Sequence, residues 1–144
     1  MTLQDLAAAL KRASSVLQRR PQAGMHADAT ASASWLGGTR IVSRHANGMQ
    51  VATDMPSELG GSGDQVSPGW LFRAGFASCT ATCIALNAAS AGIELAALEV
   101  QADSRSDARA ILGLSESNGA PVYAGPHDLP LRVRTAARGV PGER

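Results

Sequence analysis

The segment SPGWLFRAGFASCTATC, residues 67–83, decides how the rest of the chain is interpreted. Ser67 followed by Pro68 is typical of a helix start, because serine is a preferred N-cap residue and proline suits the first helical position. Small residues fill much of the segment, which also holds both cysteines of the chain, Cys79 and Cys83. The first question is therefore whether these cysteines are a reactive pair or small hydrophobic residues in a tight core.

We predict one long helix from this start to Ala91, with Gly92 as its C-terminal stop. One stripe of this helix carries almost no side-chain bulk and consists of Leu71, Ala74, Gly75, Ser78, Ala81, Thr82, Ala85 and Ala89. A stripe of small residues allows another backbone to approach closely. We therefore expect this helix to lie in the middle of the fold.

The two cysteines lie on one face of a regular helix, because Cys79 and Cys83 are four residues apart. Their Cβ atoms are then ~5–6 Å apart, whereas a disulfide needs Cβ atoms about 3.8 Å apart. A resting disulfide between them is therefore not expected. A reactive thiol needs a nearby cation to lower its pKa, whereas a free cysteine commonly serves as a small buried hydrophobic residue. Both interpretations stay open at this point.

An activating cation has to come from another part of the chain. Arg73 is the nearest basic residue in sequence, but it lies six positions before Cys79 and so points elsewhere around the helix. The candidates are Arg40 and Arg44, which belong to a predicted β-meander over residues 26–54. Gly37-Gly38 and Asn47-Gly48 supply the turns of this meander.

The remaining elements follow from the spacing of the apolar residues and from the positions of glycine and proline. Leucines at helical spacing, with Thr2 and Asp5 as a weak capping box, predict an amphipathic helix over residues 1–20 that Pro21 ends. Residues 55–69 form a Gly-, Ser- and Pro-rich loop, of a length that is often functional. Beyond the long helix we predict a strand within 93–105, a loop-rich excursion over 107–128 and a last strand over 129–137.

Composition excludes several classes of protein. The chain of 144 residues has the length of one domain and a net charge of +1, which predicts neither nucleic-acid nor membrane binding. No window approaches ~18 uninterrupted apolar residues, and the N-terminus lacks the order of a signal peptide. Two cysteines without an export signal predict a cytoplasmic protein with reduced thiols. Aromatic residues make up only 3% of the chain, which favours packing against a partner subunit.

Metal chemistry is not expected either. The three histidines, His26, His45 and His127, are scattered, and none is three or four residues from a cysteine. Zinc sites in small domains usually show clustered ligand pairs. The glycines near residue 60 are not followed by Lys-Ser or Lys-Thr, so they are not a phosphate loop.

The loop and the helix start together resemble a known family. The stretch PSELGGSGDQVSPGWLFRAGFASC is similar to the part of the OsmC/Ohr family (osmotically induced and organic-hydroperoxide-resistance proteins) that leads from a Pro-x-Glu-Leu-Gly-Gly loop into Asn-Pro-Glu-x-Leu-Phe-x-Ala-Gly-x-x-x-Cys. The matching positions are Pro56, Glu58, Leu59, Gly60, Gly61, Pro68, Leu71, Phe72, Ala74, Gly75 and Cys79. The resemblance covers roughly residues 25–136.

The resemblance implies a fold and an activity. The family folds as an α+β intertwined homodimer in which antiparallel sheets wrap central helices, so we expect a helical extension over residues 1–22 and an OsmC-like domain over 23–144. Active members reduce organic or hydrogen peroxides by a thiol mechanism, without bound metal or organic cofactor. Cys79 corresponds to the peroxidatic cysteine, which becomes a sulfenic acid. A second cysteine then forms a disulfide, which a thiol or lipoyl reductant reopens.

Three positions depart from the family pattern. Gly69 stands where the family has the glutamate that orients an activating arginine, and Arg40 is the nearest arginine, one residue beyond the family register at Thr39. The family's resolving cysteine, in a C-terminal Cys-Pro helix, has no counterpart before Arg144. Cys83 is then either a substitute resolving thiol or a packing residue. The sequence therefore predicts a thiol-dependent hydroperoxide reductase, with an inactive dimeric binding or stress module as the alternative.

Overall fold

The computed structural model describes residues 2–138. These residues form helices and antiparallel sheets, which confirms the predicted α+β class. The elements, in chain order, are α1 (Leu3–Arg19), β1 (Ser32–Gly37), β2 (Arg40–Arg44), β3 (Gln50–Thr53), α2 (Pro68–Ser90), β4 (Leu95–Ala102), α3 (Ala108–Ile111) and β5 (Leu131–Ala137), with 3-10 turns at Pro21–Gly24 and Ser57–Leu59. The chain end, where we expected the family's C-terminal helix to be missing, lies outside the described residues.

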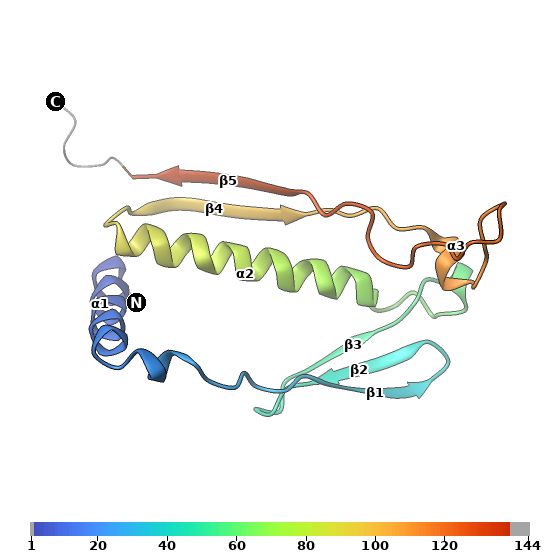
Figure 1. Ribbon diagram of the computed structural model, residues 1–144, viewed down its shortest axis with the longest axis horizontal. Helices are drawn as coiled ribbons and strands as arrows, with labels where there is room; N and C mark the ends of the chain where they lie inside the picture. Colours follow the sequence, from blue (N-terminus) through green and yellow to red (C-terminus); the bar gives the residue numbers. More distant parts are fainter. Residues whose placement is uncertain (1, 139–144) are drawn as a thin grey trace.

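The long helix α2 organises the chain (Figure 1). The antiparallel pair β4–β5 runs along one side of α2 and packs on it, while α1 crosses near its C-terminal end. The second sheet, in the order β1–β2–β3, lies on the opposite side of α2. Among the described residues this sheet does not pack closely on α2 or on β4–β5. The chain therefore consists of two layers, α2 with β4–β5 and the β1–β2–β3 sheet, that share little contact.

The ends of both long helices follow the sequence signals. The Ser67 hydroxyl accepts a hydrogen bond from the Trp70 N–H at 3.2 Å, with Pro68 in the first turn as predicted. Gly92 adopts a φ of +72° directly after α2, which is the left-handed stop that glycine allows. At the N-terminus of α1, Thr2 and Asp5 form a complete capping box, so the pattern that looked weak in the sequence is formed in full.

The β-meander is confirmed, but it begins later than predicted. The periodicity suggested a strand from His26 onward, whereas β1 begins at Ser32, opposite Arg44. The turn at residues 45–49 ends β2 at Arg44, so residues before Ser32 have no strand with which to pair. Alternation alone cannot supply the missing hydrogen-bond partners.

One face of the three-stranded sheet is apolar and open. Trp35 lies across from Ile41, and Val51 lies on the same face of β3 because side chains alternate along a strand. Trp35 is 71% exposed and Val51 is 41% exposed. A small sheet ordinarily needs such a face to be covered in order to be stable.

The single chain also leaves far more surface exposed than its size predicts. Its accessible surface is 10,843 Å², whereas the size scaling for compact monomers gives about 7,000 Å² for 14.8 kDa. Among the described residues the buried apolar side chains are few and mostly small: Val42, Ala88, Ala89 and Val122. One copy of the chain therefore does not complete a hydrophobic core.

Candidate functional site

Both cysteines lie on one exposed face of α2. Four residues lie on a single side of the helix, because they follow each other at spacings of four, three and four positions: Phe72, Phe76, Cys79 and Cys83. Both thiols are free and exposed, and the two phenylalanines are 58% and 38% exposed. The helix face is therefore an apolar surface that carries two accessible thiols.

The opposite side of α2 is the packed one. Ala88, which is nine residues after Cys79 and so on the opposite side of the helix, is buried, and α2 contacts β4 along this side. The small residues predicted to permit close approach are thus divided between two surroundings. Ala74 lies near Ala102 of β4, whereas Gly75 belongs to the exposed face with the cysteines.

Arg73 is turned away from the cysteines, as expected. Its Nη1 donates a hydrogen bond to the Ser104 hydroxyl at 3.0 Å, on the β4 side of the helix. The other predicted activators, Arg40 and Arg44, are at the two ends of β2 in the separate sheet layer. A role for Arg40 beside Cys79 therefore stays a prediction, because one copy of the chain does not bring the two side chains together.

Arg40 is held by two carboxylates instead. Its Nη2 lies 3.0 Å from Oδ2 of Asp54 and 2.6 Å from Oδ1 of Asp64. Neither acid was singled out from the sequence. Glu58, the acid of the matched loop motif, is exposed and accepts a hydrogen bond from the neighbouring Ser57 hydroxyl.

Asp54 is the centre of a polar cluster that also contains Thr39, Arg40, Ser62 and Asp64. It is 3% exposed, and its carboxylate accepts hydrogen bonds from the Thr39 hydroxyl, from the Met55 N–H at 2.9 Å and from the Ser62 N–H at 3.0 Å. The bond from Thr39, followed by that from Ser62, lowers the pKa of Asp54 to about 2. The residue is thus a fully ionised, fully bonded group at the end of β3.

The cluster closes the loop between β3 and α2. The backbone N–H of Asp54 donates to the carbonyl of Val66 at 3.0 Å, which joins the two ends of the loop. Inside the loop Gly61 has no room for a side chain, because a Cβ there would lie 1.7 Å from the carbonyl oxygen of Met55. The motif glycine therefore serves a close backbone approach, and the long loop is a compact, internally bonded structure.

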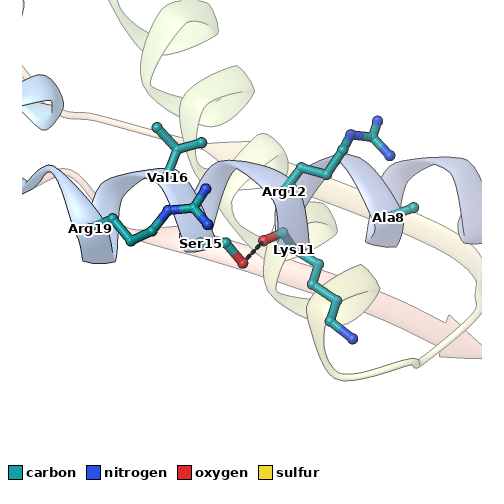
Figure 2. A pocket seen from close by; sticks show the side chains of 6 residues that line it. All are labelled: Ala8, Lys11, Arg12, Ser15, Val16 and Arg19. Carbon is teal, nitrogen blue, oxygen red and sulfur yellow. Dashed lines mark hydrogen bonds between the residues drawn. The ribbon is translucent and has the colours of Figure 1, made fainter.

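A separate groove lies on the outer side of α1 (Figure 2). It has a volume of about 560 Å³ and is lined by Ala8, Lys11, Arg12, Ser15, Val16 and Arg19. The Ser15 hydroxyl donates to the Lys11 carbonyl at 2.9 Å and so is occupied within the helix. The groove contains neither cysteine, and we do not place the candidate site there.

The described residues give no sign of a metal centre or of a membrane span. Within residues 2–138 no three His, Cys, Asp or Glu side chains are grouped so that they could hold a metal ion. Over the same range no helix is both long and apolar enough to cross a membrane.

Comparisons with known proteins decide the fold. No protein-family model and no curated protein sequence matches the chain. Among solved structures, an OsmC-like protein from Vibrio cholerae superposes with a TM-score of 0.63 at 13% identity, covering 83% of this chain and 80% of that one. A Psychrobacter arcticus protein, whose description links it to osmotic stress and detoxification, gives 0.60 at 18% identity over 81% and 77%. The chain has the OsmC/Ohr fold.

A third solved structure belongs to a protein whose own name refers to hydroperoxide resistance. An organic hydroperoxide resistance protein from Elizabethkingia anophelis matches this OsmC/Ohr-fold chain with a TM-score of 0.50 at 25% identity, covering 81% of this chain and 74% of that one. The family resemblance predicted from the loop and helix motif is thus confirmed by the fold.

Proposed function

We propose that this OsmC/Ohr-fold protein reduces hydroperoxides by a thiol mechanism in defence against oxidative stress, with Cys79 as the nucleophile. The observation that carries the proposal is the position of Cys79 on the exposed face of α2, one turn from Phe76. A thiol on an apolar surface is accessible to a small hydroperoxide. The agreement of Cys79 with the motif cysteine supports the same role.

The first chemical step is a two-electron oxidation of the sulfur. The Cys79 thiolate attacks the terminal oxygen of R–O–O–H, the S–O bond forms and the O–O bond breaks. The departing alkoxide takes up a proton and leaves as the alcohol. Cys79 is then a sulfenic acid, and no metal or organic cofactor takes part in this step.

The second step returns the sulfur to the thiol. An external thiol or dithiol, such as a lipoyl group, attacks the sulfenic sulfur and releases water to form a mixed disulfide. A second thiol then displaces Cys79 and forms the oxidised reductant. Cys83 is the alternative partner in this step, although its position one turn along α2 makes a disulfide within the same helix unfavourable. Such a cycle needs reduced thiols, which fits a cytoplasmic location.

A homodimer completes this site. Two apolar faces of one copy are uncovered: the α2 face with Phe72 and Phe76, and the β1–β3 face with Trp35 and Val51. The surplus of surface over a compact monomer is several times the ~800 Å² that each partner contributes to a standard interface. Packing of a second copy against both faces, in an intertwined arrangement, would cover them and enclose the thiols.

The test is hydroperoxide consumption in the presence of dithiothreitol or dihydrolipoamide. Wild type, Cys79→Ser and Cys83→Ser are compared with cumene hydroperoxide and with hydrogen peroxide. We expect turnover that is lost in Cys79→Ser and retained in Cys83→Ser. Consumption by the wild type no faster than by free cysteine would rule out the peroxidase.

The second candidate is a dimeric binding or stress module without peroxidase activity. Gly69 in place of the family's acid favours it, and so does the engagement of Arg40 by two carboxylates. In this case Cys79 and Cys83 are packing residues between the two copies. The same assay distinguishes the two candidates, because a module of this kind consumes no peroxide above the background of a simple thiol.

A further inference from the structure

A small cavity lies on the side of α2 that faces β4, away from the cysteines. Its volume is about 300 Å³, at the lower end of the range for small-molecule sites. Three alanines line it, together with four larger side chains: Trp70 and Arg73 of α2, Gln101 of β4 and the following Asp103. Apolar walls with a few polar groups are the usual composition of a site for a small ligand.

The Arg73 guanidinium offers the edge that suits a carboxylate. Its Nη1 donates to the Ser104 hydroxyl at 3.0 Å, and this bond restrains the group. The Nε and Nη2 groups donate no hydrogen bond within residues 2–138. The two N–H groups of this edge are parallel, and such a pair binds both oxygens of one carboxylate.

The charges around the cavity favour an anion. The carboxylate of Asp103 is paired with Arg132, and both side chains are more than half exposed, so water screens what remains of its charge. Among the described residues Arg73 has no acid partner. The residue one helical turn before it is Gly69, so no acid competes for it at that spacing. The cavity also lies near the start of α2, which is the positive end of the helix dipole.

Trp70 supplies a flat apolar wall. The residue is 49% exposed, so about half of its surface is available for contact. Its indole N–H donates no hydrogen bond to the part of the chain that the structure describes. An aromatic ring of this kind packs favourably against a second flat ring. The alanines opposite leave room for one, because their side chains are small.

We propose that this cavity binds a small planar carboxylate, in which the carboxylate pairs with the Nε–Nη2 edge of Arg73 and the flat body packs against Trp70. The site is separate from the thiol face, because Trp70 precedes Cys79 by nine residues, which is about two and a half turns of the helix. The inference does not depend on the proposed peroxidase. It assigns a second binding site to the opposite side of α2.

The experiment is an NMR titration of the full-length protein with benzoate, followed on the indole N–H signals of the two tryptophans. Trp70→Phe assigns the signals. Benzamide is the matched probe, since it has nearly the same shape without the charge. The assay contains no peroxide, so its result is separate from that of the peroxidase test.

Four variants test the role of the guanidinium. Arg73→Gln removes it, and Arg73→Lys keeps the charge without the parallel donors. Gly69→Glu places a competing acid four residues before Arg73, where a side chain has room because the nearest atom to an added Cβ is 3.6 Å away. Arg134→Gln is the control, since Arg134 is exposed on β5 and does not line the cavity.

We expect benzoate at millimolar concentration to shift the Trp70 signal more than the Trp35 signal, and benzamide to bind at least about tenfold more weakly. Arg73→Gln, Arg73→Lys and Gly69→Glu should each weaken benzoate binding by a similar factor. Arg134→Gln should leave it unchanged.

Three results would overturn the proposal. The first is the absence of a benzoate-dependent shift of the Trp70 signal, and the second is equal binding of benzoate and benzamide. The third is a loss of benzoate binding in Cys79→Ser, which would place the ligand at the thiol face. Benzoate binding that survives a folded Arg73→Gln has the same consequence, and if that variant does not fold, Gly69→Glu decides, because it leaves Arg73 and Ser104 in the chain.

Discussion

Truncation of Phe72 tests whether the exposed face of α2 is covered by a second copy. Phe72 is 58% exposed in one chain and lies on the same face as the two cysteines. If a partner buries this face, Phe72→Ala removes the apolar contact that the partner makes. If the face stays in water, the same change has little effect on association.

The size of the effect follows from the exposed part of the ring. Burying a whole phenylalanine side chain is worth about 1.5–3 kcal/mol, and 58% of this one remains to be buried. A two-fold dimer loses the contact twice, so Phe72→Ala should weaken association by about 1.7–3.5 kcal/mol. This corresponds to a roughly 20- to 350-fold increase in the dissociation constant.

Sedimentation velocity over a range of concentrations measures this constant directly. We expect wild type at twice the chain mass of 14.8 kDa, with Phe72→Ala dissociating at higher concentration. Leu112→Ala is the control, because Leu112 is 59% exposed but lies outside the α2 face. A wild type that sediments as a compact monomer at micromolar concentration, or a Phe72→Ala variant that associates like wild type, would refute the reasoning.

Three further predictions concern the loop cluster and the arrangement of the copies. Gly61→Ala places a Cβ 1.7 Å from the Met55 carbonyl oxygen and should lower the free energy of unfolding, measured with urea, by at least the ~1–3 kcal/mol typical of overpacking. Gly69→Ala is the control, because the nearest atom to its added Cβ is 3.6 Å away and stability should not fall in the same way. Equal losses of stability in the two variants would contradict the close-approach argument. The pKa of Asp54 is lowered from 3.8 to about 2, so its stabilisation is present above its unfolded-state pKa and is lost as pH falls toward 2. The difference in urea midpoint between wild type and Asp54→Asn should therefore shrink over this interval, and a difference that is constant with pH would argue against the assignment. Finally, mixing Cys79→Ser with Arg40→Gln should restore up to about a quarter of wild-type turnover, since half of randomly mixed dimers carry one intact site in trans; no recovery after confirmed subunit exchange would exclude a site shared between copies.

Local sequence determined most of the secondary structure. The Ser67-Pro68 start, the Gly92 stop and the Thr2–Asp5 cap all use side chains or φ angles within a few residues of the element they end, so they are readable from the chain alone. The meander turns are equally local. The start of β1 was misjudged because a strand also needs a partner, and the length of β2 sets where that partner ends.

The candidate site was predictable only in part. Cys79 stood out through its motif, and its place on one face with Cys83 follows from helical spacing. Asp54 gave no comparable signal, because its partners Thr39 and Ser62 are 15 and 8 residues away and meet it only when the loop folds back. A single aspartate before a loop is ordinary in sequence, and its burial is visible only in the folded chain.

The sequence by itself determined the helices, the strands and the fold that the motif implied, since these depend on side-chain periodicity and on local backbone preferences. Only the tertiary structure decided which faces are left open and where the charges lie. It turned the cysteine face of α2 away from β4–β5, and it bound Arg40 to Asp54 and Asp64. Burial and ion pairing depend on groups distant in the chain, and their energies are set only when the layers come together.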